Sequence, residues 1–356
     1  MALLEVENLR TNFYTEEGKV KAVNDVSYDI EAGERFGVVG ESGAGKSVTS
    51  LSVMGLIENP GRIDGGEIRF KGENLLEASE ERLQEIRGGE IAMIFQEPQS
   101  ALNPVYTVGE QISEAIRKHM DLEGNAVKER AIDMLRRVGI PDPEERYHNY
   151  PHQFSGGMQQ RAVIAIALSC DPELIVADEP TTALDVTIEA QILELLEELS
   201  EEFDVAIQLI THDLGVVAEI CNRVMVMYAG KAVEKAPVEE LYYDPKHPYT
   251  VGLMGSIPRI GDERDRLDTI PGTMPDLVQL PPGCSFHPRC PYAEEACTQN
   301  EPPLVDVETG EPAEGLTDSE HTAACLEYTG ELQGALDFDV EVKEDDWNAD
   351  ATGVDT

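Results

Sequence analysis

Basic residues are scarce in this chain. Its 356 residues include 27 lysines and arginines against 70 aspartates and glutamates, a formal net charge of −43. A chain this acidic offers nucleic acid no general electrostatic footprint, so we expect no nucleic-acid partner. Hydrophobic residues still make up 41% of the sequence and recur periodically, which argues against disorder. We expect adaptation to high intracellular salt, which screens the repulsion among the carboxylates.

Long hydrophobic runs are also absent. The longest apolar stretch of note, residues 162–170, is too short for a membrane span, which takes about 18 residues. No apolar signal segment follows Met1. We therefore expect a soluble, cytoplasmic chain that reaches a membrane only through partner proteins. Its length and hydrophobic content suffice for one large domain with an appendage, or for two domains.

Paired C-x2-C motifs are missing, although four cysteines cluster late in the chain with the spacing C-x5-C-x6-C-x27-C. These four are Cys284, Cys290, Cys297 and Cys325. Disulfides are not expected in a reducing cytosol, so a metal centre is the leading alternative to plain buried thiols. The spacing matches neither common zinc sites nor ferredoxins, and by itself leaves metal and no metal equally open. Four thiolates would suit a [4Fe–4S] cluster or zinc.

A phosphate-binding loop is present. The apolar residues 36–39 precede a stretch that fits G-x-x-x-x-G-K-[ST] from residue 40 to residue 47. The glycines allow a tight turn whose N–H groups converge on phosphate oxygens, and the following helix start attracts anions. The lysine suits the β- and γ-phosphates and the serine hydroxyl suits Mg²⁺. The predicted nucleoside triphosphate site comprises Gly40, Glu41, Ser42, Gly43, Ala44, Gly45, Lys46, Ser47 and Val48.

Polar residues follow three predicted apolar strands, at residues 91–95, 174–177 and 205–210. The carboxyl ends of parallel strands border the ligand crevice of an open α/β sheet. We interpret Gln96 as a ligand of Mg²⁺ or of the attacking water, and Asp178 as part of the Mg²⁺ shell. Glu179 would polarise that water, and His212 would contact the γ-phosphate or hold the water. Taken singly, a solvated acid pair or a structural histidine would explain these residues as well.

A second helix start of the anion-binding type stands at Ser155, Gly156 and Gly157, before a predicted helix over residues 158–169. Amphipathic helices between residues 100 and 150 predict an inserted helical lobe. Two phosphate sites on different lobes favour two chains facing head to tail, each nucleotide lying between one chain's loop and the other's helix start. An ordinary capped helix is the alternative.

The remaining elements predict an α/β fold. Alternation over residues 3–9 and 20–30 predicts an antiparallel pair of strands, with Phe13 placed to stack on a base or to serve as a core aromatic. Residues 47–57 and 187–203 predict helices, and residues 223–229 and 231–235 a hairpin. Cys170 and Cys221 each end an apolar helix, so we expect both in the core.

These motifs stand in the order and spacing of the ATP-binding-cassette (ABC) ATPases, which residues 3–243 resemble. The resemblance implies Walker A at 40–47, the Q-loop at Gln96, the signature at 154–158 and Walker B with catalytic Glu179. It also implies the D-loop around Asp185, the switch His212 and adenine stacking on Phe13. The signature reads Phe-Ser-Gly-Gly-Met where the family has Leu-Ser-Gly-Gly-Gln. Because the serine and glycines supply the γ-phosphate contacts, the site stays plausible.

Residues 247–325 resemble the C-terminal extension of the oligopeptide/dipeptide importer branch, through 247–250, 256–258, 270–272, 283–286 and 289–290. The loop at 40–48 resembles the first, D-type, of its two paired ATPases. The resemblance implies a second ATPase in a heterodimer, two transmembrane permease subunits and an extracellular solute-binding protein. It also places this subunit on the cytoplasmic face of the membrane. Some relatives carry an iron–sulfur cluster at the matching cysteines, which favours the [4Fe–4S] cluster over zinc.

The sequence therefore predicts a P-loop NTPase with a RecA-like core, an antiparallel β-subdomain and an inserted helical subdomain over about residues 98–170. The cassette would span residues 1–244, the cysteine-containing extension 245–326 and an acidic, disordered tail 327–356. ATP and Mg²⁺ are the expected cofactors, and import of di- or oligopeptides the expected role. The alternatives are import of nickel or a small saccharide, and a non-transport ABC ATPase of DNA repair or translation. Metal storage with a regulatory ATPase is a further alternative.

Overall fold

The structure is a computed structural model that describes residues 2–96, 98–182, 184–255, 270–313, 321–332, 336 and 338. The chain folds into two compact units, and each unit takes segments from several parts of the sequence. Unit 1 comprises Met1–Leu4, Ile30–Arg35 and Arg69–Ile210. Unit 2 comprises Glu5–Asp29, Phe36–Ile68 and Thr211–Thr356. The predicted boundaries at residues 244 and 326 do not coincide with this division and stay a prediction.

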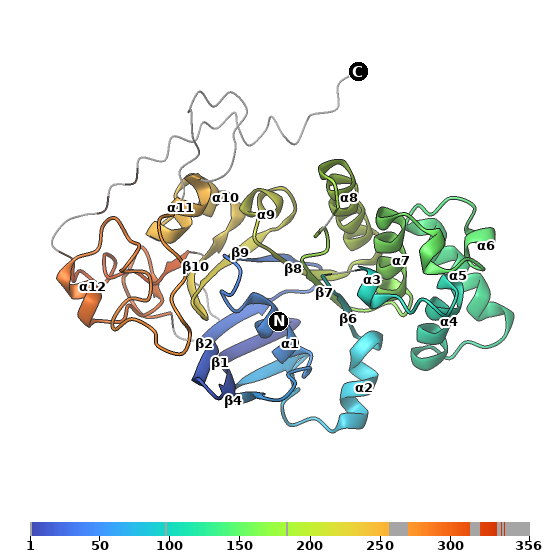
Figure 1. Cartoon of the computed structure of the whole chain (residues 1–356), viewed down its shortest axis with the longest axis horizontal. Helices are drawn as coiled ribbons and strands as arrows, with labels where there is room; N and C mark the ends of the chain where they lie inside the picture. Colours follow the sequence, from blue (N-terminus) through green and yellow to red (C-terminus); the bar gives the residue numbers. More distant parts are fainter. Residues whose placement is uncertain are drawn as a thin grey trace, which may run out of the picture. The chain divides into compact units, whose positions relative to one another are not determined.

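Unit 1 is built on parallel strands in the order β8-β7-β6, of which β7 and β8 are buried along their whole length. Most of its elements are labelled in Figure 1. They are β5 (Glu73–Asn74), α2 (Glu80–Gly89), β6 (Ile91–Ile94), α3 (Pro98–Ala101), α4 (Val108–His119), α5 (Asn125–Arg137), α6 (Pro143–Arg146), η1 (Pro151–Gln153), α7 (Gly156–Leu168), β7 (Leu174–Asp178), α8 (Val186–Phe203) and β8 (Ala206–Thr211). Continuous apolar runs predict buried parallel strands, and the structure confirms this at 91–94, 174–178 and 206–211.

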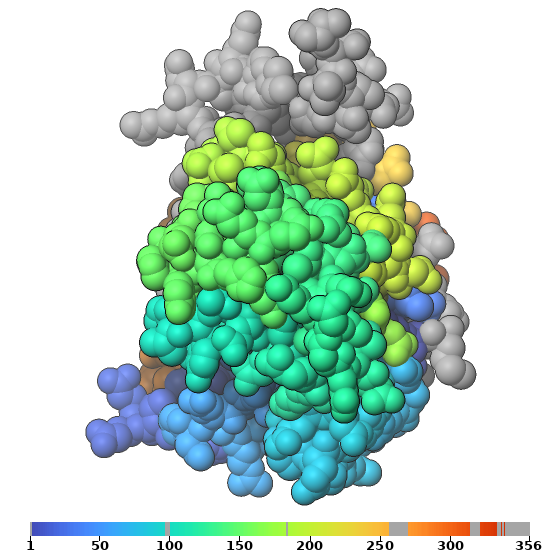
Figure 2. Space-filling view, turned by 90° about the vertical axis from the view of Figure 1, so that its right-hand side faces the viewer, coloured from blue at the N-terminus to red at the C-terminus, as the bar shows by residue number. Residues whose placement is uncertain are grey.

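Helices α4, α5 and α7 pack on one another and form the helical lobe (Figure 1). Figure 2 views this lobe from outside, coloured teal to green. The Thr107 side chain caps α4 by accepting from the N–H of Glu110. Helices α4 and α5 each bury one apolar face: Val108, Ile112 and Ile116 on α4, and Val127, Ala131, Met134 and Leu135 on α5. The helices predicted between residues 100 and 150 are thus present, whereas the insertion over about residues 98–170 stays a prediction.

Unit 2 holds two sets of hydrogen-bonded strands, β2-β1-β4 from the four-stranded sheet and β11-β12-β10-β9-β3 from the eight-stranded sheet. Its elements are β1 (Leu4–Thr15), β2 (Gly18–Ile30), β3 (Arg35–Val39), α1 (Lys46–Val53), β4 (Gly61–Phe70), α9 (Leu214–Ile220), β9 (Arg223–Tyr228), β10 (Lys231–Pro237), α10 (Val238–Tyr243), α11 (Pro248–Gly255), α12 (Glu295–Gln299), β11 (Val305–Asp306) and β12 (Thr322–Ala323). Strand β3 runs parallel to β9, whereas β10 is antiparallel to both β9 and β12.

The helix after the phosphate loop is shorter than predicted. It ends at Val53 rather than at residue 57, because Gly55 adopts a positive φ of 61°. The N–H of Leu56 then donates to the carbonyl of Leu51 at 2.8 Å, which closes the helix end. Strand β4 begins at Gly61.

The sequence predicts a disordered tail from residue 327. Residues 327–332 nevertheless have described positions: the Tyr328 hydroxyl donates to the carbonyl of Lys246 at 2.9 Å, and Asn300 donates to Glu331 at 2.7 Å. The continuously described C-terminal region thus reaches residue 332. Of the predicted tail beyond it, only residues 336 and 338 are described, and the resemblance segment 256–258 also lies outside the described residues. Among the described residues, no helix is both long and apolar enough to cross a membrane.

Candidate ATP site and cysteine pocket

The phosphate loop lies in unit 2 between the buried strand β3 and helix α1. Its glycines are required by space as well as by conformation. A Cβ on Gly40 would come within 2.3 Å of the carbonyl oxygen of Met227, and one on Gly45 within 2.2 Å of that of Ala22. Since real Cβ atoms do not approach so closely, the neighbouring backbone fixes the course of the loop.

Lys46 is the first residue of α1, and its side chain folds back over the loop. Its Nζ donates to the carbonyls of Gly40 at 2.6 Å and Glu41 at 3.2 Å, and only 5% of the residue is exposed. The buried ammonium group therefore lies beside the loop at the N-terminus of helix α1. A cation next to the free N–H groups of a helix N-terminus attracts phosphate. Ser47 follows on the first turn of the same helix.

Phe13 and Tyr14 lie near the end of β1. The Phe13 ring packs against Gly61, where a Cβ would come within 2.7 Å of Cε1. Tyr14 instead hydrogen-bonds Asp64 through its hydroxyl, with the Lys19 ammonium 5.6 Å from its ring centre. The assignment of Phe13 as the base-stacking ring stays a prediction.

In unit 1 the structure brings Gln96 and Glu179 together, although 83 residues separate them. The Gln96 Nε2 donates to the Glu179 Oε2 at 2.6 Å, and the Thr182 hydroxyl donates to the same oxygen at 2.9 Å. Glu179 follows directly after β7 and has a φ of +45°, which is rare for a residue with a side chain. Such strain collects at functional sites, and the two hydrogen bonds hold the carboxylate in place. Asp178, at the end of β7, is 7% exposed.

Ser155 caps helix α7, because its hydroxyl accepts from the N–H of Met158 at 3.3 Å. Ser155 and Gly156 are exposed at the surface of unit 1. Gly157 is packed so closely that a Cβ there would come within 2.8 Å of Ile188. Asp185 caps α8 in the same way, accepting from the N–H of Ile188 at 3.1 Å. Ala183 lies outside the described residues.

His212 belongs to unit 2 and follows β8 directly, with an exposed side chain. The next residue, Asp213, caps α9 by accepting from the N–H of Gly215 at 2.8 Å. The predicted site residues thus divide between the units. Gln96, Ser155, Asp178, Glu179 and Asp185 lie in unit 1, whereas the loop, Phe13 and His212 lie in unit 2.

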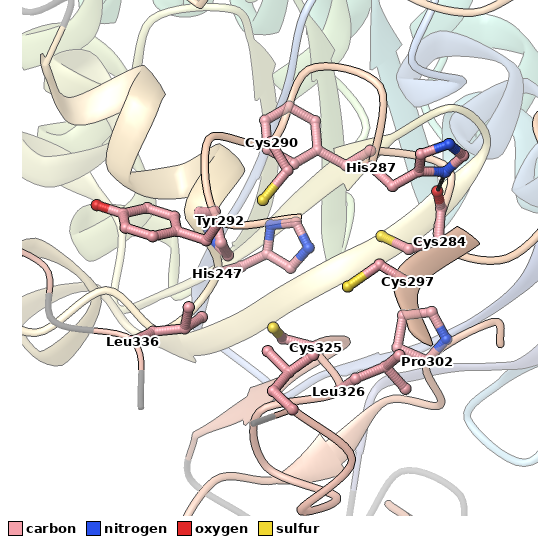
Figure 3. Close-up of a pocket in the computed structure, with 13 residues that line it drawn as sticks. His247, Cys284, His287, Cys290, Tyr292, Cys297, Pro302, Cys325, Leu326 and Leu336 are labelled. Atoms are coloured by element: carbon pink, nitrogen blue, oxygen red, sulfur yellow. Dashed lines mark hydrogen bonds between the residues drawn. The ribbon is translucent and has the colours of Figure 1, made fainter. Parts of the chain in front are cut away.

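The four clustered cysteines line one pocket of unit 2. Figure 3 shows their sulfurs pointing towards a shared space. The pocket has an empty volume of about 350 Å³, which includes the part open to solvent. Apolar side chains complete the wall, among them Phe286 and Leu326. Burial raises the pKa of Cys290 to about 11 and that of Cys325 to about 12, and it also raises the pKa of Cys284. These thiols are therefore protonated at neutral pH.

The expected metal centre is not supported by the side-chain arrangement. Across the described ranges, no group of three or more histidine, cysteine, aspartate or glutamate side chains is arranged to hold a metal ion. Cys170 and Cys221, predicted to be core residues, are buried and each 8% exposed. This prediction is confirmed.

Sequence reasoning missed the histidines of the pocket and the contacts of the loop with the C-terminal region. His247 and His287 line the pocket beside the cysteines. Burial lowers the pKa of His247 to about 4, so its imidazole is neutral. Tyr249 and Arg289 both bond Glu41 of the phosphate loop. In the sequence, the only signal for His247 and Arg289 is that they belong to the segments 247–250 and 289–290, which carry the family resemblance.

Comparison with known proteins finds a family match for the predicted cassette and another for the predicted C-terminal extension. Residues 23–182 match the ABC transporter family, and residues 233–297 match the oligopeptide/dipeptide transporter C-terminal region. A probable peptide ABC transporter ATP-binding protein of Sinorhizobium fredii is 51% identical, over 91% of this chain and 94% of the relative. The oligopeptide transport ATP-binding protein AppD of Bacillus subtilis is 50% identical, over 86% of this chain and 94% of AppD.

Among solved structures, a dimeric ATP-binding cassette in a post-hydrolysis state with ADP and phosphate superposes with a TM-score of 0.59. It is 27% identical, and the match covers 66% of this chain and 98% of that structure. The predicted α/β P-loop fold and the predicted ATPase activity agree with these matches. This chain belongs to the ABC transporter family, in the branch with the oligopeptide/dipeptide transporter C-terminal region, and it is an ATP-hydrolysing transport subunit.

Proposed function

We propose that this ATPase energises the import of di- or oligopeptides. The observation that carries the proposal is the C-terminal match at residues 233–297, together with the peptide-transport names of the relatives at 50% and 51% identity. The cassette would work on the cytoplasmic face of the membrane as a heterodimer with a second ATPase. Two permease subunits and an extracellular solute-binding protein would complete the importer.

Transport measurements test this proposal. The full complex would be assembled in vesicles, and uptake of a labelled dipeptide, a labelled pentapeptide, nickel and a labelled disaccharide would be followed in molar KCl. We expect ATP-dependent uptake of a peptide. ATP-dependent uptake of nickel or the disaccharide alone would contradict the peptide assignment and support another solute. Co-purification of the chain with nucleic acid, and without membrane proteins, would support the non-transport alternative.

For the reaction, we propose that the N–H groups and Lys46 of the loop bind the ATP phosphates. Ser47, Asp178 and Gln96 would complete the Mg²⁺ shell, since hydroxyl, carboxylate and amide oxygens suit this ion. Glu179, fixed by Gln96 and Thr182, would accept a proton from the attacking water. His212 would hydrogen-bond the γ-phosphate, and Phe13 would stack on the adenine.

Exposed polar groups support the cassette dimer. Ser155 and Gly156 open helix α7 at the surface of unit 1, so their hydroxyl and amide can reach a nucleotide held by a partner cassette. A Leu184 methyl lies 3.7 Å from a Cβ built on Gly156, so the segment around Asp185 borders the same surface. We infer that this face meets the second ATPase.

A groove on unit 1 suits the permease contact. It is lined by residues from α2, β6, α3, α4 and α7, among them Ala92, Ala101 and Val163, and by Phe95, which follows β6. Phe95 is 42% exposed, and Val105 and Tyr106 nearby in sequence are 70% and 47% exposed. Since exposed apolar groups mark protein contacts, we propose that a permease segment docks here, next to Gln96.

We further propose that Cys284, Cys290, Cys297 and Cys325 hold a [4Fe–4S] cluster, with zinc as the alternative. The four thiols line one pocket whose apolar walls would shield a cluster from solvent. Their side chains are not arranged to hold a metal ion in this structure, so they would have to converge on binding. Metal ligands are thiolates, so cluster binding would have to remove the protons from Cys284, Cys290 and Cys325, whose pKa values are raised by burial. A bound cluster would supply one-electron redox chemistry. Anaerobic purification with iron and zinc analysis is the test, and a colourless protein with neither metal would eliminate the proposal.

The charge of −43 supports a proposal of adaptation to high salt, because screening lowers the repulsion among carboxylates. Urea unfolding at rising KCl tests it. We expect stability to increase from low to molar KCl. Full stability and activity without added salt would contradict the proposal.

A further inference from the structure

The phosphate loop of unit 2 is bonded by residues that lie more than 200 positions later in the chain. The N–H of Glu41 donates to the Tyr249 hydroxyl at 2.9 Å, across 208 residues. The Glu41 carboxylate accepts from the Arg289 Nη1 at 2.9 Å and 3.2 Å, across 248 residues. Both the main chain and the side chain of this loop residue are therefore held by the C-terminal region.

Arg289 is itself fixed in place. It is 8% exposed, its Nε donates to the carbonyl of Pro271 at 2.8 Å, and its guanidinium lies 5.8 Å from the centre of the Tyr228 ring. Most surface ion pairs contribute little because two flexible side chains must be ordered. This pair differs, since the planar guanidinium is already held from other sides before it meets Glu41.

The same contacts lead to the cysteine pocket. The rings of Tyr228, Tyr249 and Phe286 pack with centroid distances of 4.7, 5.2 and 5.4 Å. Phe286 also lines the pocket, and its carbonyl accepts from the N–H groups of Arg289 and Cys290. One short turn thus directs Arg289 to the phosphate loop and Cys290 into the pocket.

Charge makes the contact necessary. A carboxylate in a loop that binds a polyphosphate repels its ligand, so Glu41 needs a cation beside it. Its carbonyl and that of Gly40 also hold the Lys46 ammonium. A displaced Glu41 would therefore disturb the position of Lys46 as well as the loop itself.

We propose that Arg289 and Tyr249 are positioning residues of the ATP site. Tyr249 fixes the main chain of the loop at Glu41, and Arg289 fixes and neutralises the Glu41 side chain. The C-terminal region thereby becomes part of the nucleotide site, and changes in the cysteine pocket reach the loop through the turn at 286–290. This role goes beyond the proposed import function and does not depend on the solute that is carried.

The test is a double-mutant cycle on ATP affinity in the full chain. Binding of Mg²⁺ and a non-hydrolysable ATP analogue would be measured by calorimetry in molar KCl for R289Q, E41Q, the double variant and Y249F. We expect R289Q to weaken binding about 10-fold, as loss of a charged hydrogen bond predicts. The double variant should recover most of this loss, because the uncompensated carboxylate is gone. Y249F should weaken binding about 3-fold or more.

Matched variants supply the control and the contrary outcomes. R136Q removes an exposed arginine that bonds Glu144 at 2.9 Å, and it should leave affinity unchanged. In the assembled complex R289Q should raise the KM for ATP while kcat stays near wild type, a split that general destabilisation would not give. Affinity of R289Q within 2-fold of wild type would overturn the proposal. If R289Q fails to fold, unchanged affinity in both R289K and Y249F would overturn it.

Discussion

The replacement of Glu179 by glutamine tests the chemistry assigned to unit 1. Gln96 and Thr182 both donate to the same carboxylate oxygen, Oε2, at 2.6 and 2.9 Å. A glutamine can place its amide oxygen there and keep both bonds, so the variant should fold and bind ATP normally. It cannot accept a proton from water. General bases contribute about 10²- to 10⁴-fold in rate, and this loss corresponds to about 3 to 5 kcal/mol in the barrier.

The assay is phosphate release by the assembled importer in molar KCl, with ATP-analogue affinity measured in parallel. We expect Glu179→Gln to lower kcat at least 100-fold and to leave affinity within 2-fold of wild type. Glu201→Gln is the matched control, since Glu201 is an exposed acid of α8 that pairs with Arg35 at 3.4 Å. Hydrolysis by Glu179→Gln within 10-fold of wild type would refute the assignment of Glu179 as the base.

Three further predictions concern the loop, the pocket and the core. Gly45→Ala should abolish ATP-analogue binding in calorimetry, because its Cβ would come within 2.2 Å of a backbone carbonyl; binding at wild-type affinity would contradict this. The pKa values of Cys290 and Cys325, raised by burial to about 11 and about 12, make the metal-free protein lose stability as pH rises from about 9 towards 11. Urea unfolding along a pH series measures this, and constant stability would contradict it. Ile192→Ala on the buried face of α8 should lower the unfolding free energy by about 2 to 5 kcal/mol. The control Val186→Ala should change it by less than about 0.5 kcal/mol, because Val186 is 82% exposed. Equal effects of the two substitutions would contradict the described packing of α8.

Local order was predictable wherever one periodicity dominates. The apolar run before Asp178 predicts a buried strand, and β7 ends at that residue. Ser155 is a capping type before an apolar helix, and it accepts the expected N–H bond. The helix after Lys46 was predicted too long because the pattern continues past Gly55, whose positive φ ends it.

Long-range contacts were not predictable from single residues. Nothing near Glu41 in the sequence signals a bond to Arg289, because the pairing arises from how β3, β9 and the C-terminal region fold together in unit 2. The strain at Glu179 is likewise invisible before the backbone is seen. Cysteine spacing indicated a shared site, and the four thiols do line one pocket. Spacing could not reveal that burial raises the pKa values of Cys284, Cys290 and Cys325.

The pairing of β12 with β10 has a practical consequence for dissecting this protein. Glu234 and Lys235 of β10 pair with Ala323 and Thr322, so the extension supplies the outer neighbour of a strand that belongs to the predicted cassette. A shortened version that stops at residue 244 would leave β10 with an open edge, and open edges recruit strands from other molecules. Such a fragment should aggregate even though every nucleotide motif is retained. Expression of the cassette alone is therefore a poor route to its enzymology.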